Sequence, residues 1–374
     1  MAVTPFRIDV PQAVLDDLAE RLSRTRWPTA EGAGWARGTN GQYLRGLLER
    51  WQHGYDWRAH EAELNRLDHV LVDVDVDDLA VHAVHQRSDD PAATAVLLLH
   101  GWPDSFYRFA KVLPLLLDLH VVVPSLPGYG FTASPGTSST RMADVMAALM
   151  SELGYQRFAV SGGDVGSRVA EALAGRHGDR LVALHLTNVP YHHLFAMDPE
   201  SLSEPERAFL QAGQQWVMSE GAYALMQSTR PVTAAYGLTD SPVGLAGWIV
   251  EKLRAWSDCD GDLDRRFTAD EVLTHLMIYW VTGTIGSSFT NYAEDDPQAG
   301  GGRVDVPTGV AIFPRDIVPA PRAFGERLFD VRRWTDMPRG GHFAAWEEPR
   351  LFADDLRALL ASVTAPQAQR ATGA

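Results

Sequence analysis

The sequence has almost no cysteine, since Cys259 is the single one among 374 residues. A disulfide within the chain is therefore excluded, which favours a reducing compartment. The N-terminal stretch MAVTPFRIDV lacks the basic start and apolar core of a secretion signal. The longest apolar runs, such as AVLLL at 95–99, are far shorter than the roughly 20 residues of a membrane-spanning helix. We expect a cytoplasmic protein without a membrane anchor.

Basic side chains are also scarce, because 33 Lys and Arg stand against 48 Asp and Glu, for a net charge of −15. An acidic balance without a dense Lys/Arg cluster argues against a nucleic-acid partner. The run DCDGDLD at 258–264 lacks the glycine and carboxylate spacing of a calcium loop, and we interpret it as a solvated acidic loop. His192 and His193 are adjacent, so we expect their side chains to point in different directions. The sequence predicts no metal and no cofactor.

What is present is a change of hydrophobic period along the chain. Apolar residues recur at helical spacing in 11–26 and 41–51 and then alternate in 69–78 and 79–86, which predicts an antiparallel strand pair after helices. Short, continuous apolar runs follow and alternate with helical stretches, a pattern typical of buried parallel strands in βαβ units. These runs lie at 94–101, 120–128, 157–163 and 180–187, with later strand candidates at 306–314 and 331–338.

The stretch SGGDVGS, residues 161–167, lies between a predicted strand and a predicted helix. Gly162 and Gly166 bracket Asp164, as small residues bracket the reactive side chain of a nucleophile elbow. Ser161 offers a rival register, because small residues also stand two positions before and after it, but it lies inside the apolar run. A structural interpretation is a glycine-rich turn in which Asp164 caps the helix.

Two later positions complete a nucleophile, acid and base in the order of an α/β-hydrolase. Asp316 follows the predicted strand in VAIFPRD, a better strand end than those near Asp305 and Asp336. His342 follows two glycines in RGGHFAAWEEP, where this fold delivers its general base. The alternatives are a packed or solvated histidine and an ordinary loop acid.

An oxyanion hole is expected beside this elbow. The loop HGWPDSF, residues 100–106, directly follows an apolar strand and precedes the elbow in the chain. The backbone N–H groups of Trp102 and Val165 would form the hole, which stabilises negative charge on a reacting oxygen. The structural alternative is an ordinary loop at a strand end.

The predicted architecture is an α/β-hydrolase fold with a mostly parallel central sheet, a helical lid insertion and an N-terminal helical arm. Helical spacing of Leu, Met, Trp and Tyr predicts the lid, and a last amphipathic helix is expected at 347–363. We expect the arm to wrap the core and the lid to supply most of an apolar pocket. The predicted segments are the arm 1–68, the first core part 69–195, the lid 196–295, the second core part 296–366 and a disordered tail 367–374.

Several long motifs together resemble the microsomal-type epoxide hydrolases over nearly the whole chain. The resemblance implies that Asp164 is the nucleophile, Asp316 the charge-relay acid and His342 the base. It also implies that two lid tyrosines act as acids, Tyr223 in AYALMQSTRP and Tyr292 in SSFTNYAEDD. The motifs are HGWP (100–103), GGDVGS (162–167), QSTRPVTAAYGLTDSPVGLAGWIVEKL (227–253), LTHLMIYWVTGTIGSS (273–288), VPTGVAIFPRD (306–316), GGHFAAWEEP (340–349) and, in the arm, RTRWP (24–28) and GTNGQYLRGLLERWQHGYDWRAHEAELN (38–65).

The activity that this resemblance implies is hydrolysis of a hydrophobic, aryl- or alkyl-substituted epoxide to a vicinal diol. The partners are then the small epoxide and water, and a homodimer is a further hypothesis. A haloalkane dehalogenase would share the elbow aspartate and the histidine, but typically has Trp after the nucleophile, where this chain has Val165. A serine esterase using Ser161 and a non-catalytic small-molecule binding protein are the remaining alternatives.

Overall fold

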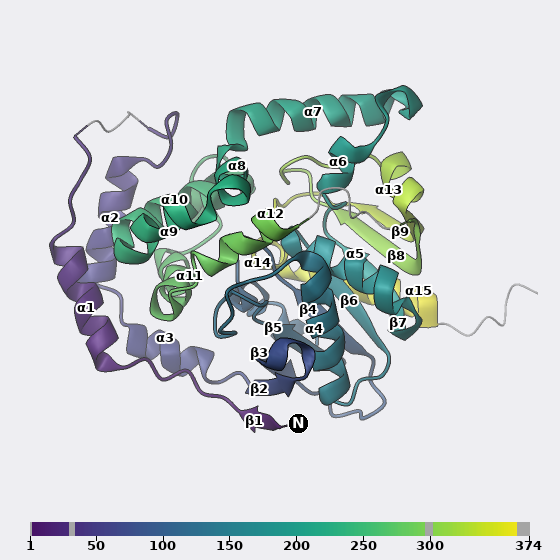
Figure 1. The fold of residues 1–374 in the computed structure, drawn as a ribbon, viewed down its shortest axis with the longest axis horizontal. Helices are drawn as coiled ribbons and strands as arrows, with labels where there is room; N and C mark the ends of the chain where they lie inside the picture. Colours follow the sequence, from purple (N-terminus) through teal and green to yellow (C-terminus); the bar gives the residue numbers. More distant parts are fainter. Residues whose placement is uncertain (1, 30–33, 296–301, 365–374) are drawn as a thin grey trace, which may run out of the picture.

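The computed structural model describes residues 2–29, 34–295 and 302–364 (Figure 1). The strands are β1 (Val3–Pro5), β2 (His69–Val74), β3 (Leu79–Gln86), β4 (Ala95–Leu99), β5 (His120–Pro124), β6 (Phe158–Gly162), β7 (Leu181–Leu186), β8 (Val304–Ile312) and β9 (Phe329–Asp336). The α-helices are α1 (Gln12–Ser23), α2 (Gly41–His53), α3 (Trp57–Leu64), α4 (Ser139–Glu152), α5 (Val165–His177), α6 (His192–Ala196), α7 (Glu204–Glu220), α8 (Ala222–Thr229), α9 (Pro231–Asp240), α10 (Pro242–Trp256), α11 (Ala269–Thr282), α12 (Thr290–Glu294), α13 (Arg322–Leu328), α14 (Ala344–Glu347) and α15 (Pro349–Thr364). Short 3₁₀ turns are η1 (Val76–Asp78), η2 (Phe106–Phe109), η3 (Leu113–Leu115), η4 (Gly178–Arg180), η5 (Pro199–Ser201), η6 (Leu263–Arg265) and η7 (Ser287–Phe289).

The strands of the described residues form one sheet in the order β1-β2-β3-β5-β4-β6-β7-β8-β9. The strands from β5 to β9 in this order pair in parallel, whereas β1, β2 and β3 pair antiparallel, and β3 joins β5 antiparallel. Every strand predicted from hydrophobic period is present, including the antiparallel pair with His69 opposite Val84. The strand β1 is not predictable from period, because it has three exposed residues.

The sheet is buried on both faces because its central strands carry no polar alternation. All five residues of β4 and of β5 are buried. Helices must therefore cover both faces, and Figure 1 shows α4 and α5 in front of the strands and α15 behind them. The loops that follow β4, β6, β7, β8 and β9 leave the carboxyl ends of parallel strands, so they meet at one edge of the sheet.

The N-terminal arm contacts both the core, where β1 joins the sheet beside β2, and the lid, on which its helices pack; the contact with the lid was not predicted. Figure 1 shows α1 and α2 beside α10 and α11, and β1 joins the sheet by pairing with β2. Arg50 on α2 pairs with Asp270 on α11 at 2.7 Å, and Tyr55 Oη lies 3.0 Å from Thr274 Oγ1. Since α4, α5 and α15 already cover the sheet, the apolar face of α2 finds its partner on the lid.

The stretch between β7 and β8 is helical within the described residues, from α6 to α12. Capping boxes start two of its helices, with Ser203 and Glu206 at α7 and Thr268 and Glu271 at α11. The predicted disordered tail 367–374 lies outside the described residues. The segment boundaries predicted from the sequence remain proposals, and the second core part begins in a stretch, 296–301, that is also outside them.

Candidate active site

Asp164 lies at a tight turn between β6 and α5. Its φ of 57° is uncommon for a residue with a side chain, and Asn188 Oδ1 accepts its backbone N–H at 2.8 Å. Glycine is required two residues before and two residues after Asp164. A Cβ on Gly162 would lie 2.2 Å from the carbonyl oxygen of Gly166, and one on Gly166 would lie 2.4 Å from that of Leu99. The turn is therefore a nucleophile elbow by geometry, with strain held by close backbone packing.

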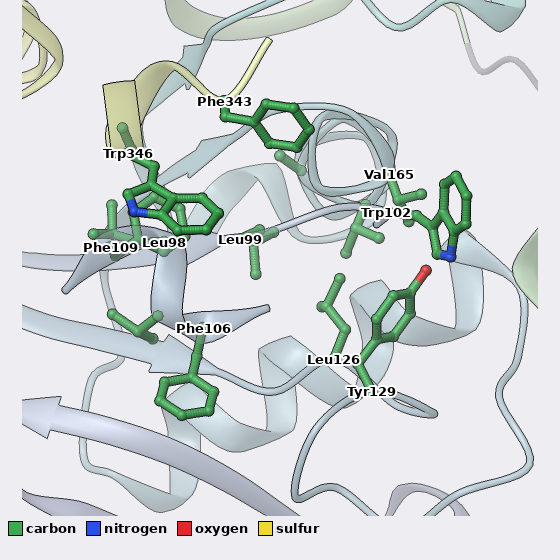
Figure 2. Close-up of a cluster of buried hydrophobic side chains, with 14 of the residues drawn as sticks. Leu98, Leu99, Trp102, Phe106, Phe109, Leu126, Tyr129, Val165, Phe343 and Trp346 are labelled. Carbon is green, nitrogen blue, oxygen red and sulfur yellow. The ribbon is translucent and has the colours of Figure 1, made fainter. Parts of the chain in front are cut away.

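Two backbone amides hold the Asp164 carboxylate. The Trp102 N–H donates to Oδ1 at 2.8 Å, and the neighbouring Val165 N–H also helps to lower the pKa of this carboxylate. Gly101 leaves room for the contact, because a Cβ there would lie 2.4 Å from Asp164 Oδ1. Figure 2 shows Trp102 and Val165 together at one side of a buried apolar cluster, with the Tyr129 ring directed toward them. Packing thus fixes both donors, as an oxyanion hole requires.

His342 lies between two carboxylates. Its Nδ1 lies 2.7 Å from Asp316 Oδ1, and its Nε2 lies 3.4 Å from Asp164 Oδ2. Burial lowers the pKa of His342, but the charges of Asp316 and Asp164 and hydrogen bonds to them outweigh it and raise that pKa to about 10. Burial likewise raises the pKa of Asp164, but His342 and the two amides outweigh it and hold that pKa below its ordinary value. The resting site is an ion pair.

Tyr223 on α8 and Tyr292 on α12 come together above this carboxylate. Their rings are in edge-to-face contact with centroids 6.1 Å apart, and the Tyr223 ring stacks on Trp102 with centroids 5.0 Å apart. Burial raises the pKa of both phenols well above the usual range, and the negative charge of Asp164 adds to the shift. Both phenols therefore stay protonated at neutral pH and can donate.

One cavity of about 300 Å³ joins these groups. Asp164, Tyr223 and Tyr292 line it, so the nucleophile candidate and the two phenols face the same space. Most of the remaining lining is apolar and comes from the lid and from the loop after β8. These apolar residues include Leu194, Trp216, Val217, Ile317 and Val318.

Comparison with known proteins agrees with this geometry. Residues 3–109 match the family described as epoxide hydrolase N terminus, and residues 94–231 match the alpha/beta hydrolase fold. The chain is 40% identical to a Stigmatella aurantiaca protein that carries the provisional name epoxide hydrolase, over 95% of this chain and 84% of that protein. It is 33% identical to epoxide hydrolase 1 of Sus scrofa, over 95% of this chain and 88% of the relative.

The chain belongs to the epoxide hydrolase family. The structure of the Aspergillus niger epoxide hydrolase superposes with a TM-score of 0.86 at 31% identity, and the match covers 97% of each chain. The predicted α/β-hydrolase fold is therefore confirmed. None of the helices in the described residues combines the length and the apolar character needed to cross a membrane.

A second nucleophile, histidine and acid lie in the core of this family member. Ser161 Oγ is 2.8 Å from His185 Nδ1, and His185 Nε2 is 3.3 Å from Asp355 Oδ2. The ring is reversed relative to a serine hydrolase, in which Nε2 faces the serine and Nδ1 the acid. The three residues are 1%, 0% and 2% exposed, so a substrate has no access to this serine. The serine-esterase alternative is not supported by this arrangement.

His192 and His193 do not point in different directions, which corrects the sequence-based expectation. His193 Nε2 lies 2.5 Å from Glu171 Oε1, and His192 Nε2 lies 3.6 Å from Glu171 Oε2. Both rings therefore reach the one carboxylate of Glu171, and their centroids are 4.0 Å apart. Among the described residues these three could converge on a metal ion. The 2.5 Å contact is a hydrogen bond, and two ligands of one ion lie farther apart than that.

The acidic run 258–264 is partly structural, which corrects its interpretation as a solvated loop. Asp258 is largely buried, pairs with Arg266 at 2.9 Å and accepts the Gly340 N–H at 2.9 Å. Asp262 caps the turn η6 by accepting the Asp264 N–H. The run therefore tethers the loop that leads to His342.

Sequence reasoning missed residues that hold this histidine loop. Glu347 is buried and accepts the N–H groups of Asp258, Gly341 and Phe343 at 2.7–3.0 Å. Burial raises the pKa of Glu347 to about 7 although these donors oppose the shift. Glu347 stands in the quoted motif GGHFAAWEEP, so its position was available as a signal.

The ion pair of Arg108 and Asp104 was missed in the same way. The two groups lie 2.8 Å apart with side chains 2% and 1% exposed, and Arg108 donates to the His342 carbonyl at 3.2 Å. Asp104 lies in the quoted motif HGWPDSF. Tyr191, whose hydroxyl donates to Asp316 at 3.0 Å, lies outside every motif, and its only signal is its place after β7.

Proposed function

We propose that this chain hydrolyses hydrophobic, aryl- or alkyl-substituted epoxides to vicinal diols through an ester on Asp164. One observation carries the proposal: an ionised carboxylate and two protonated phenols face each other across an apolar cavity. Opening an epoxide needs a nucleophile on the ring carbon and a proton donor on the ring oxygen at the same time.

In the first step, Asp164 Oδ2 attacks an epoxide carbon. A C–O ester bond forms, the ring C–O bond breaks, and its electron pair goes to the ring oxygen. Tyr223 and Tyr292 hydrogen-bond that oxygen, and one of them supplies the proton. Oδ1 stays with the Trp102 amide throughout, so the elbow presents one oxygen for attack and retains the other.

In the second step, water attacks the Asp164 ester carbonyl, and His342 takes the water's proton. The negative charge develops on Oδ1, where the amides of Trp102 and Val165 stabilise it. The bond between the Asp164 carbonyl carbon and Oδ2 then breaks, the second proton of the water passes to Oδ2, and the diol leaves with that oxygen. His342 keeps the first proton, so the ionised Asp164 and the protonated imidazole of the resting site are restored.

His342 changes its protonation between the two steps. In the resting site, the charges of Asp164 and Asp316 keep the imidazole protonated. Ester formation removes the negative charge of Asp164, so the pKa of His342 falls. The imidazole then passes its proton to the phenolate that the first step left, and in its neutral form it can act as a base. The charge pair therefore keeps Asp164 ionised before alkylation, and its loss on alkylation lowers the pKa of His342.

The same residues argue against the other activities. A halide leaving group needs N–H donors and no proton, whereas this cavity presents two phenols, and Val165 follows the nucleophile candidate. A protein that only binds would not need an ion pair beside a strained elbow. We further propose that the chain works in the cytoplasm, where its lone buried Cys259 stays reduced. A homodimer remains a prediction.

A single turnover in ¹⁸O-water tests the mechanism. Excess enzyme reacts with styrene oxide, and mass spectrometry follows the diol and the peptide that bears Asp164. An ester mechanism leaves the first diol unlabelled and places ¹⁸O in Asp164. Label in the first diol would show direct attack by water, and absence of reaction with a panel of aryl and alkyl epoxides would overturn the proposed substrate class.

A further inference from the structure

Asp316 Oδ1 accepts three hydrogen bonds. The donors are His342 Nδ1 at 2.7 Å, the Ile317 N–H at 2.7 Å and the Tyr191 hydroxyl at 3.0 Å. A carboxylate oxygen offers about two lone pairs, and here three donors share them. The hydrogen bond to His342 is therefore weaker than it would be without the phenol.

The Tyr191 hydroxyl is directed to this Asp316 oxygen. Tyr191 follows β7 and lines the cavity, and its ring lies roughly parallel to the His342 ring with centroids 6.5 Å apart and an angle of 28°. Burial raises the pKa of Tyr191 well above its usual range, and the charge of Asp316 adds to the shift. The phenol is thus a permanent neutral donor, and the carboxylate is its acceptor.

We propose that Tyr191 is a positioning residue of the ester-hydrolysis step, because its hydroxyl shares Asp316 Oδ1 with the imidazole and so limits how strongly Asp316 holds the His342 proton. The step requires a neutral imidazole. A histidine bound too tightly by its acid would remain protonated after Asp164 is esterified. The Tyr191 hydrogen bond reduces the negative charge that Asp316 presents to the imidazole. His342 then remains basic enough to accept a proton and weak enough as a base to lose it.

Other charged groups near His342 do not contact this oxygen. Asp164 is removed as a charge by ester formation, Arg108 contacts the His342 carbonyl and is paired with Asp104, and Glu347 is bound to three backbone amides. The groups that face the imidazole and its loop from the surrounding elements are Asp164, Asp316, Tyr191, Arg108, Asp104, Glu347 and Asp258.

The inference rests on the proposed function, and Tyr191→Phe tests it by removing one hydroxyl. Stopped-flow tryptophan fluorescence with rapid-quench mass spectrometry separates alkylation from hydrolysis between pH 5 and 10. We expect alkylation within about 2-fold of the wild-type rate. The acid limb of the hydrolysis profile should move up by about half to one pH unit, which slows hydrolysis about 3- to 10-fold below that limb. Tyr236→Phe is the matched control, since Tyr236 is 77% exposed on α9.

The double variant Tyr191→Phe with Asp316→Asn separates this role from packing. The comparison is with Asp316→Asn alone. Without the carboxylate charge, removing the Tyr191 hydroxyl should leave the pH profile of hydrolysis the same as in Asp316→Asn, whereas an effect of packing would still separate the two variants. An unmoved acid limb in Tyr191→Phe, or equal slowing of both steps, overturns the inference. Wild-type enzyme that forms no ester with any tested epoxide would instead overturn the proposed function, so the two failures are distinguishable.

Discussion

The chain contains two sets of a nucleophilic side chain, a histidine and an aspartate, and only one of them is built as a site. Asp164, His342 and Asp316 meet where parallel strands end, beside a cavity of about 300 Å³. Ser161 on β6, His185 on β7 and Asp355 on α15 have comparable contacts, but they lie inside the core, although Ser161 is only three residues before Asp164 in the chain. Residue types and distances are therefore similar in the two sets.

The two sets differ in the backbone conformation of the nucleophilic residue and in the access of a substrate to it. At Asp164 the chain adopts φ 57°, which turns the side chain out of the sheet and toward two amides. Ser161 lies within the regular strand β6, so its side chain stays between the sheet and the covering helix, where its hydroxyl serves only to satisfy His185. Such a set of three side chains becomes a candidate catalytic site when a tight turn exposes the nucleophile and hydrogen-bond donors already lie where negative charge will develop.

Removing the proposed nucleophile should have the largest effect. Asp164→Ala leaves no carboxylate to form the ester, so we expect kcat to fall by more than about 10⁴-fold. Rapid-quench mass spectrometry should find no alkylated enzyme. Asp260→Ala is a matched control, because Asp260 also has a positive φ, 49°, but lies on an exposed turn. More than one per cent of wild-type turnover in Asp164→Ala would contradict the assignment.

Replacing the histidine should separate the two steps. His342→Gln removes the base, so we expect hydrolysis to slow about 10²- to 10⁴-fold while the ester on Asp164 accumulates and remains detectable by intact mass. His185→Gln should instead lower stability, with turnover per folded molecule retained. If His185→Gln trapped the ester, the core set would have a catalytic part and the comparison would fail.

The two tyrosines should affect the other step. Tyr223→Phe and Tyr292→Phe each remove one donor to the ring oxygen, so we expect alkylation to slow about 10- to 10³-fold. Hydrolysis of a preformed ester should change by only a few fold. Tyr236→Phe again serves as the exposed control. Equal slowing of both steps would show that the phenols support the cavity rather than the leaving oxygen.

The charge of Asp164 should set the protonation of His342 in the resting enzyme. With its pKa raised to about 10, the imidazole is protonated at neutral pH and loses its proton only as the pH rises through that value. Asp164→Asn removes the charge without changing the shape, so the pKa of His342 should fall by about one unit or more. NMR of histidine-labelled protein measures both titrations, and intact mass verifies that the asparagine persists. Identical titrations would contradict the proposed change of protonation.

The sequence predicted those parts of the site that local motifs encode. Asp164 and His342 stand in glycine-rich turns whose chemistry is visible in a few residues, and the strands are visible as apolar runs. Tyr191 could not be predicted in this way, because its contact with Asp316 joins loops 125 positions apart along the chain. Its partner depends on which strands are neighbours in the sheet, and hydrophobic period does not encode strand order.

Two errors have the same physical origin. Adjacent residues on a helix point about 100° apart, so His192 and His193 were expected to diverge, yet long side chains on the short helix α6 both reach Glu171. The arm was expected to wrap the core; its strand β1 joins the sheet, but its helices cover the lid, because their apolar faces could not show which apolar surface they meet. Both outcomes depend on tertiary packing, which a local pattern leaves undetermined.

The smallest effect on activity should come from the serine of the buried set. Ser161→Ala leaves Asp164 and its donors untouched, so we expect kcat and KM within about 2-fold of wild type. Stability should fall by about 1–3 kcal/mol, because His185 Nδ1 loses its partner in a site with no access to water. Urea denaturation measures the second quantity, and Ser161→Thr, which keeps the hydroxyl, helps to separate hydrogen bonding from packing. Lost turnover in a stably folded Ser161→Ala would show that the buried set affects the site. Unchanged turnover with reduced stability means that a similar set of side chains serves structure in one place and reaction in the other.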